Sequence, residues 1–211
     1  MRKRLFGGVV SIVALAIVLG PSPLRADIGT LHIGTSYSSI TDGGSFDVST
    51  WNGTSLQYLY CIDVHDYISP GGDYTNTSAT TNGHVTTSTG WFGSVVAGQI
   101  AFLLDNYGVA GQNTSQVVAL QEAIWKTIYG RSFDYGSPTT PEDTTAKGYY
   151  DLAVASKAGN VGAYLWFSPN TGDTTIHQAE VGKVPEPTSI VLLGAFLGAG
   201  LLGFAAKRRL S

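Results

Sequence analysis

The chain has 211 residues, with 12 lysines and arginines against 15 aspartates and glutamates. Seven basic residues lie in the first 25 or last five positions, so residues 27–184 hold five basic and fourteen acidic residues, a net charge of −9. A body this acidic is unsuited to nucleic acid, because attraction to phosphate needs a basic surface. A single cysteine excludes intramolecular disulfides and thiolate-rich metal sites, and the four histidines lack metal-site spacing. We therefore expect no metal, cofactor or nucleic-acid partner.

Residues 1–26 have the pattern of a secretory signal peptide. Arg2, Lys3 and Arg4 precede an apolar run from Leu5 to Leu19, and prolines follow the run. We expect cleavage after Ala26 and export of the body; an uncleaved N-terminal anchor is the alternative.

The next forty residues are strand-like, with predicted strands at Leu31–Ile33, Ser45–Ser49 and Ser55–His65 and a turn signal at Asn52-Gly53. On the longest strand the even-numbered residues, which are mostly apolar, form the packing face. Cys61 lies on the opposite face, which predicts that it points towards a second, less apolar layer.

A polar segment from Ser69 to Gly90 is predicted to be a long loop. Helical periodicity follows at Phe92–Tyr107, Ser115–Ile128 and, more weakly, Glu142–Ala158. In the second helix an apolar stripe contains one glutamine, Gln121, and Glu122 and Lys126 are predicted to form an outward i, i+4 charge pair.

Two further strands are predicted at Val161–Phe167 and Thr174–Lys183. Residues 27–183 are therefore predicted to form one α+β domain, a strand-rich sandwich or barrel-like body with two to three inserted helices.

The C-terminal residues 184–211 have the pattern of a membrane anchor. Residues Ser189–Ala206 are uncharged and are followed by the basic residues 207–209. An eighteen-residue helix is about 27 Å long, close to the roughly 30 Å hydrocarbon layer. The basic residues predict that this end stays in the cytoplasm, with the body outside.

The sequence Val184-Pro185-Glu186-Pro187 before this span resembles the PEP-CTERM sorting signal of Gram-negative bacteria. The resemblance covers about the last 28 residues. It implies transient anchoring in the inner membrane, processing by an exosortase, and release to the cell surface or extracellular matrix. It also implies an association with exopolysaccharide and biofilm.

Gln121 and Cys61 are the two residues that need a chemical explanation. An amide inside an apolar stripe is costly unless its polar atoms find partners, so Gln121 could be bonded to backbone carbonyls. A free cysteine is unusual in an exported protein. A γ-glutamyl thioester, formed from the thiol and the amide with loss of ammonia, would explain both residues.

The segments Tyr60-Cys61-Ile62-Asp63 and Gln121-Glu122-Ala123-Ile124-Trp125 resemble the reactive motifs of the thioester domain of bacterial surface adhesins. The element order is similar over roughly Gly29 to Trp166, although Leu120 stands where the adhesins commonly have threonine. The resemblance implies a thioester between Cys61 and Gln121 that captures an amine-bearing surface target once, so the protein would be an adhesion module and not an enzyme.

Two alternatives remain open. The body could be a non-covalent structural or glycan-associating matrix protein with an inert Cys61 and Gln121. Aromatic residues that could stack on sugars are Tyr58, Tyr60, Tyr67, Trp91, Trp125 and Trp166, although most lie at periodic positions that predict burial in the core. A thiol hydrolase could use Cys61, His65 and either Asp63 or Asp66. Four residues along a strand separate Cys61 from His65 by about 13 Å, which argues against the hydrolase.

Overall fold

The computed structural model describes residues 27–34, 45–46, 48–108, 114–135, 139–170 and 175–183. The predicted signal peptide (1–26), sorting motif (184–187) and membrane span (189–206) lie outside the described residues. Among the helices that are described, none is long and apolar enough to cross a bilayer.

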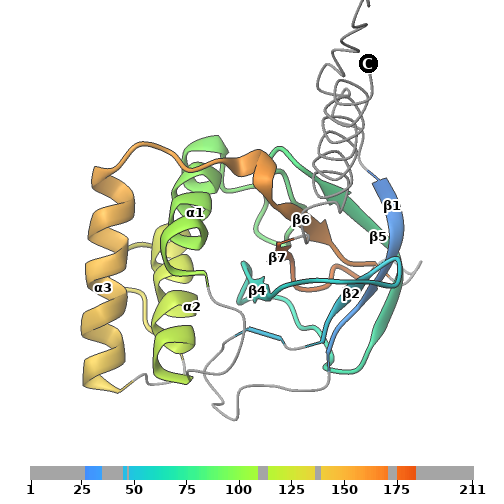
Figure 1. Cartoon of the computed structure of the whole chain (residues 1–211), viewed down its shortest axis with the longest axis horizontal. Coiled ribbons are helices and arrows are strands. Elements are labelled where there is room, and N and C mark those ends of the chain that lie inside the picture. The colour runs from blue at the N-terminus through green and yellow to red at the C-terminus, as the bar shows by residue number, and fades with distance from the viewer. Residues whose placement is uncertain are drawn as a thin grey trace, which may run out of the picture.

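In the described part of the chain, seven strands form one curled antiparallel sheet in the order β3-β2-β1-β5-β6-β7-β4 (Figure 1). The strands are β1 (Asp27–His32), β2 (Thr50–Trp51), β3 (Thr54–Ser55), β4 (Leu59–Cys61), β5 (Asp73–Thr80), β6 (Leu165–Ser168) and β7 (Glu180–Gly182). The β2–β3 hairpin turns at Asn52 and Gly53, both with positive φ, as a tight two-residue turn requires. The predicted turn is confirmed.

Three helices are inserted between β5 and β6: α1 (Ser94–Tyr107), α2 (Thr114–Tyr129) and α3 (Thr140–Ala155), followed by the short 3₁₀-helix η1 (Val161–Ala163). The helices stand beside one another on one side of the sheet (Figure 1). Helix α3 begins with a capping box, in which the Glu142 carboxylate accepts hydrogen bonds from the backbone N–H and hydroxyl of Thr139. The predicted α+β class with inserted helices is confirmed.

The strand predictions need three corrections. The described strands form a single curled sheet and not two stacked sheets, so of the predicted sandwich and barrel-like forms the sandwich is wrong. The predicted strand Ser55–His65 is paired only at its start and at Leu59–Cys61. The predicted loop Ser69–Gly90 contains the longest strand, β5, which pairs with both β1 and β6.

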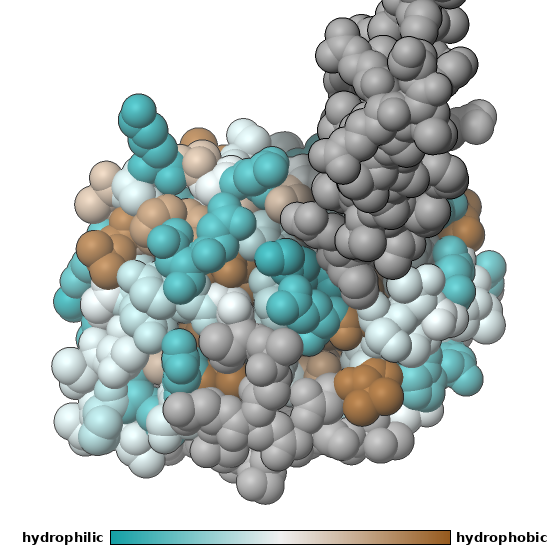
Figure 2. All heavy atoms as spheres, in the orientation of Figure 1, coloured by the Kyte–Doolittle hydropathy of each residue, from teal (hydrophilic) through white to brown (hydrophobic). Residues whose placement is uncertain are grey.

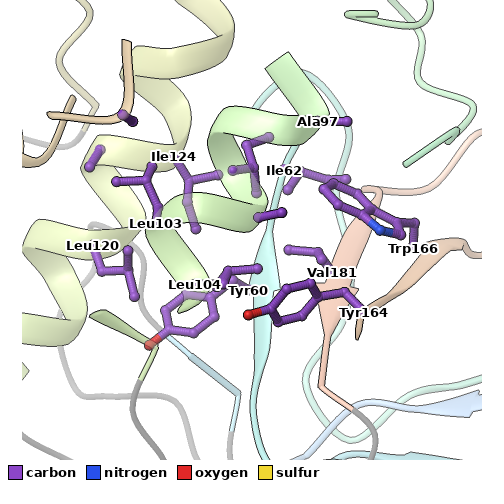
Figure 3. Packing of buried hydrophobic residues seen from close by; sticks show 14 of the residues in the cluster. Tyr60, Ile62, Ala97, Leu103, Leu104, Leu120, Ile124, Tyr164, Trp166 and Val181 are labelled. Carbon is purple, nitrogen blue, oxygen red and sulfur yellow. The ribbon is translucent and has the colours of Figure 1, made fainter. Parts of the chain in front are cut away.

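Two hydrophobic cores lie on opposite faces of β4 and its neighbours. The first core fills the space between the helices and the sheet, where Tyr60, Ile62 and Val181 meet Leu104 and Ile124 (Figure 3). The second core collects side chains of alternate residues, with Leu59, Cys61 and Phe167 packed near Leu31 and Trp51. The prediction that Cys61 faces away from the main packing face is confirmed.

Candidate functional site

Cys61 lies at the end of β4, which is the last strand of the sheet order, and its residue is only 3% exposed. It is directly opposite Glu180 of β7. The next residue, Ile62, donates its N–H to the carbonyl of Ala179 on the β7 side. Because neighbouring residues of a strand direct their backbone groups to opposite sides, the N–H and C=O of Cys61 point away from β7. On this outer edge the Leu59 carbonyl accepts a hydrogen bond from the Phe46 N–H, and none of the described strands pairs with Cys61 itself there.

Gln121 of α2 is the partner of these two backbone groups. Its Oε1 accepts a hydrogen bond of 3.0 Å from the Cys61 backbone N–H, and its Nε2 donates one of 2.6 Å to the Cys61 carbonyl. The side-chain amide thus pairs with Cys61 as a peptide group of a further strand would. The structure brings the two predicted site residues together and gives both polar atoms of the buried amide a partner.

Helix α2 runs along the edge of β4 and closes the site on both faces of the sheet. Leu120 and Ile124 join the first core, whereas Trp125 packs into the second core with Cys61. Gln121 lies between these positions in sequence and contacts the strand edge. The polar residue inside an apolar stripe is thus explained by the edge of a strand, which presents polar groups to the helix.

Glu180 is the functional candidate that sequence reasoning missed. It is fully buried beside the Cys61 thiol, and neither carboxyl oxygen has a hydrogen-bond partner of the ordinary N–H or O–H kind among the described residues. Burial raises the pKa of Glu180 well above its usual range, and the contact with the thiol only partly opposes this. Burial likewise raises the pKa of the Cys61 thiol, and Glu180 raises it further. Burial therefore favours the uncharged form of both groups, the thiol and the carboxylic acid.

No local signal in the sequence identifies Glu180. It lies between Ala179 and Val181, and strand alternation would direct a lone glutamate there towards solvent. The helices cover the face of β7 that holds Ala179 and Val181, and Glu180 on the other face is also buried, so all three residues are inaccessible. Only the pairing of β7 with β4 reveals that Glu180 faces the thiol.

The residues proposed for a hydrolase are not assembled around the thiol. The His65 ring is exposed and lies edge-on to the ring of Tyr129 at 5.3 Å. Asp63 accepts hydrogen bonds from the His65 backbone N–H and the Tyr129 hydroxyl, and burial raises its pKa to about 6. The histidine ring thus contacts an aromatic residue of α2, and the groups that act on the Cys61 thiol are Glu180 and Asp63.

The predicted outward pair Glu122 and Lys126 is wrong, because both residues are completely buried. Helix α3 covers this side of α2. The Lys126 ammonium binds Asp134 at 2.6 Å and Asp143 of α3 at 3.1 Å, and it also donates to the Phe133 carbonyl. The lysine therefore joins α2 to α3.

The aromatic residues divide as expected between core and surface. Tyr58, Tyr60, Trp125 and Trp166 are buried, whereas Tyr67 and Trp91 are 74% and 46% exposed. Trp91 lines a pocket together with His65, Thr87, Thr89 and Tyr129 among other residues. On the face of the molecule seen in Figure 2, the described residues are mostly hydrophilic and apolar residues form small separate groups.

Comparisons with known proteins add no relative. No protein-family model matches the chain, and neither a curated protein nor a solved structure is significantly similar to it. The functional argument therefore depends on the geometry of the site.

Proposed function

We propose that this protein is an exported, exosortase-sorted protein of the cell surface or extracellular matrix whose body is a thioester-type adhesion module. Cys61 and Gln121 form an internal γ-glutamyl thioester, which an amine on a surface target opens once. The product is an amide bond that tethers the two partners, so the protein is not a turnover enzyme.

One observation carries this proposal: the backbone of Cys61 holds both ends of the Gln121 amide. The residue that bears the thiol also donates its N–H to the carbonyl oxygen that would become negative during attack. A donor of this kind stabilises a developing oxyanion, and serine proteases likewise use the backbone N–H of their nucleophile. The second hydrogen bond holds Nε2, the atom that leaves as ammonia.

Burial supports the persistence of the product. Cys61, Gln121 and Trp125 are each at most 3% exposed, so the described residues keep water away from the bond. A thioester is uncharged, and it suits a buried site better than an ionised thiolate would. We infer that the target reaches the bond only when the cover over it opens.

The sorting part of the proposal has separate support, from the two ends of the sequence. An N-terminal signal-like segment and the Val184–Pro187 motif before an uncharged run favour export, membrane arrest and cleavage by an exosortase. The acidic body is consistent with a protein that meets other cell-surface polymers and not nucleic acid.

Methylamine tests the adhesion module directly. We expect native protein to gain one methylamine at Gln121 and, in the same reaction, one titratable thiol at Cys61. Peptide mapping locates the adduct, and Cys61→Ala should take up none. A freely titratable thiol before treatment, with no adduct after it, would contradict the proposal.

A non-covalent, glycan-associating matrix protein is the second candidate. The pocket at Trp91 favours it, because a half-exposed indole beside threonine hydroxyls and a histidine can stack on a sugar ring and bond its hydroxyls. In that case Trp91→Ala should weaken binding to purified exopolysaccharide about tenfold, while Tyr67→Ala, outside the pocket, should not. Equal binding by both variants would remove this candidate.

A further inference from the structure

Glu180 is a fully buried carboxyl, and the fold alone does not explain why an acidic residue lies at this position. A buried carboxyl without partners is destabilising, and the usual remedies are a cation or several hydrogen-bond donors. Glu180 has neither among the described residues; the titratable groups that act on it are the Cys61 thiol and, more weakly, the Asp63 carboxyl. Among these titratable groups, the Cys61 thiol therefore acts most strongly on Glu180.

The surroundings of Glu180 differ from those of two other buried carboxyls, Asp63 and Glu122. Asp63 has hydrogen-bond donors in the His65 backbone and Tyr129, and Glu122 lies near the Lys126 ammonium. Glu180 differs from both because it is directly opposite the cysteine on the neighbouring strand. Opposite residues of antiparallel strands hold their side chains on one face and within contact distance.

We propose that Glu180 is the proton-transfer residue for thioester formation between Cys61 and Gln121. The inference rests on the proposed function and adds a catalytic residue to it. Buried thiols ionise poorly, so attack on an amide requires that the thiol proton leaves as the new bond forms, and the amide nitrogen must be protonated before it can depart. A neutral carboxyl has an acceptor oxygen for the first proton and an O–H donor for the second.

The step is balanced in atoms and charge. The sulfur of Cys61 bonds to Cδ of Gln121 while its proton passes to one oxygen of Glu180. For ammonia to leave, the proton on the other oxygen must then reach Nε2 as the Cδ–Nε2 bond breaks. One S–H and one C–N bond are lost, and one S–C and one N–H bond are gained. Glu180 ends as a neutral acid, and nothing is oxidised or reduced.

The test follows ammonia loss by intact mass as the whole chain refolds in mild detergent. The starting material is unfolded protein from inclusion bodies whose mass equals the unmodified sequence. We expect Glu180→Gln to slow ammonia loss at least about 100-fold, the lower range for general acid–base catalysis. Glu122→Gln is the matched control, since it also removes a fully buried carboxyl whose oxygens lack partners, and it should react at the wild-type rate.

The outcomes separate this inference from the proposed function. Ammonia loss at equal rates in wild type and Glu180→Gln, or equal slowing in both variants, overturns the role of Glu180 and leaves the thioester intact. A wild-type chain that folds and never loses ammonia overturns both.

If the Glu180→Gln variant fails to fold, a measurement on the wild type tests the same inference. In the wild type, the rate of ammonia loss should fall as pH rises far enough to ionise Glu180, which Cys61 and Asp63 face. A rate that rises with pH throughout, as attack by a free thiolate would give, contradicts the inference.

Discussion

Gln121 stabilises the protein through the same two hydrogen bonds that the proposed thioester formation would use. Its amide satisfies the outward N–H and C=O of Cys61 on the edge of β4 where, among the described residues, Ser45 and Phe46 pair with Tyr60 and Leu59. The fold therefore requires a hydrogen-bonding side chain at this position even if no covalent bond forms. Stability and reactivity can be separated only in a chain that lacks the thiol.

Replacing Gln121 by leucine in a Cys61→Ala background should lower the free energy of unfolding by about 2–5 kcal/mol. Leucine has a similar volume but leaves two buried backbone groups without partners, at roughly 1–3 kcal/mol each. Urea unfolding monitored by circular dichroism measures the change, with Cys61→Ala alone as reference. A loss below about 1 kcal/mol would mean that water or a shifted backbone replaces the amide.

At this scale the sequence identified two of the three residues of the site. Gln121 stands out because it is polar within an apolar helical stripe, and Cys61 because it is the only thiol. Glu180 could not be found in this way, because its role depends on the strand pairing that places it opposite Cys61. Local periodicity carries no information about which distant residue shares a register position.

At the scale of elements, the helices were predictable because their signals are local. The apolar period and the turn residues placed the α1 and α2 boundaries within two residues of those observed. The strands were not, since β5 is rich in threonine, serine and asparagine and was taken for a loop. Alternation is present only in its second half, where Thr77 and Ala79 are buried, because a register shift in the pairing with β1 puts the buried Tyr74 out of phase. β-Branched threonine suits a sheet, so polarity alone misled the prediction.

The burial of Glu122 between α2 and α3 makes the stability of the helical layer depend on pH. Burial is the main cause that raises its pKa from 4.5 to about 7, although Lys126 opposes the shift. Between these values the folded state holds a proton that the unfolded state has lost, so this group's contribution to stability decreases as pH rises from about 4.5 to 7 and is constant above.

Glu122→Gln removes that contribution. The variant should therefore gain stability relative to wild type as pH rises through this window, reaching about 1–3 kcal/mol at pH 8. Urea unfolding at pH 5 and pH 8 gives the difference for each protein, and the comparison cancels the effects of Asp63 and Glu180. A difference independent of pH would show that Glu122 is ionised in the folded state.

At the scale of the whole molecule, the proposal assigns different tasks to different parts of the chain. Residues 27–183 contain the candidate site, and the proposed sorting signal in residues 184–211 would determine where the protein is delivered. The candidate site contains none of the C-terminal residues 184–211. The thioester and the sorting signal can therefore be tested independently, and either can fail without the other.

The Glu186→Ala variant tests whether the proposed sorting motif is recognised. The uncharged run is untouched, so the variant should still insert into the inner membrane, but it should remain there with residues 189–211 attached. Fractionation followed by mass spectrometry of the recovered protein measures both outcomes, with Thr188→Ala as the neighbouring control. Release of the Glu186→Ala protein at the wild-type level would exclude recognition through this motif.

The intact mass of native protein recovered from outside the cell tests the central claim most directly. With both end segments accounted for, the account predicts that the wild-type body is lighter than its sequence by one ammonia and that Cys61→Ala has the full mass of its own sequence. A wild-type body with the unmodified mass and a thiol that titrates upon unfolding would contradict the thioester between Cys61 and Gln121.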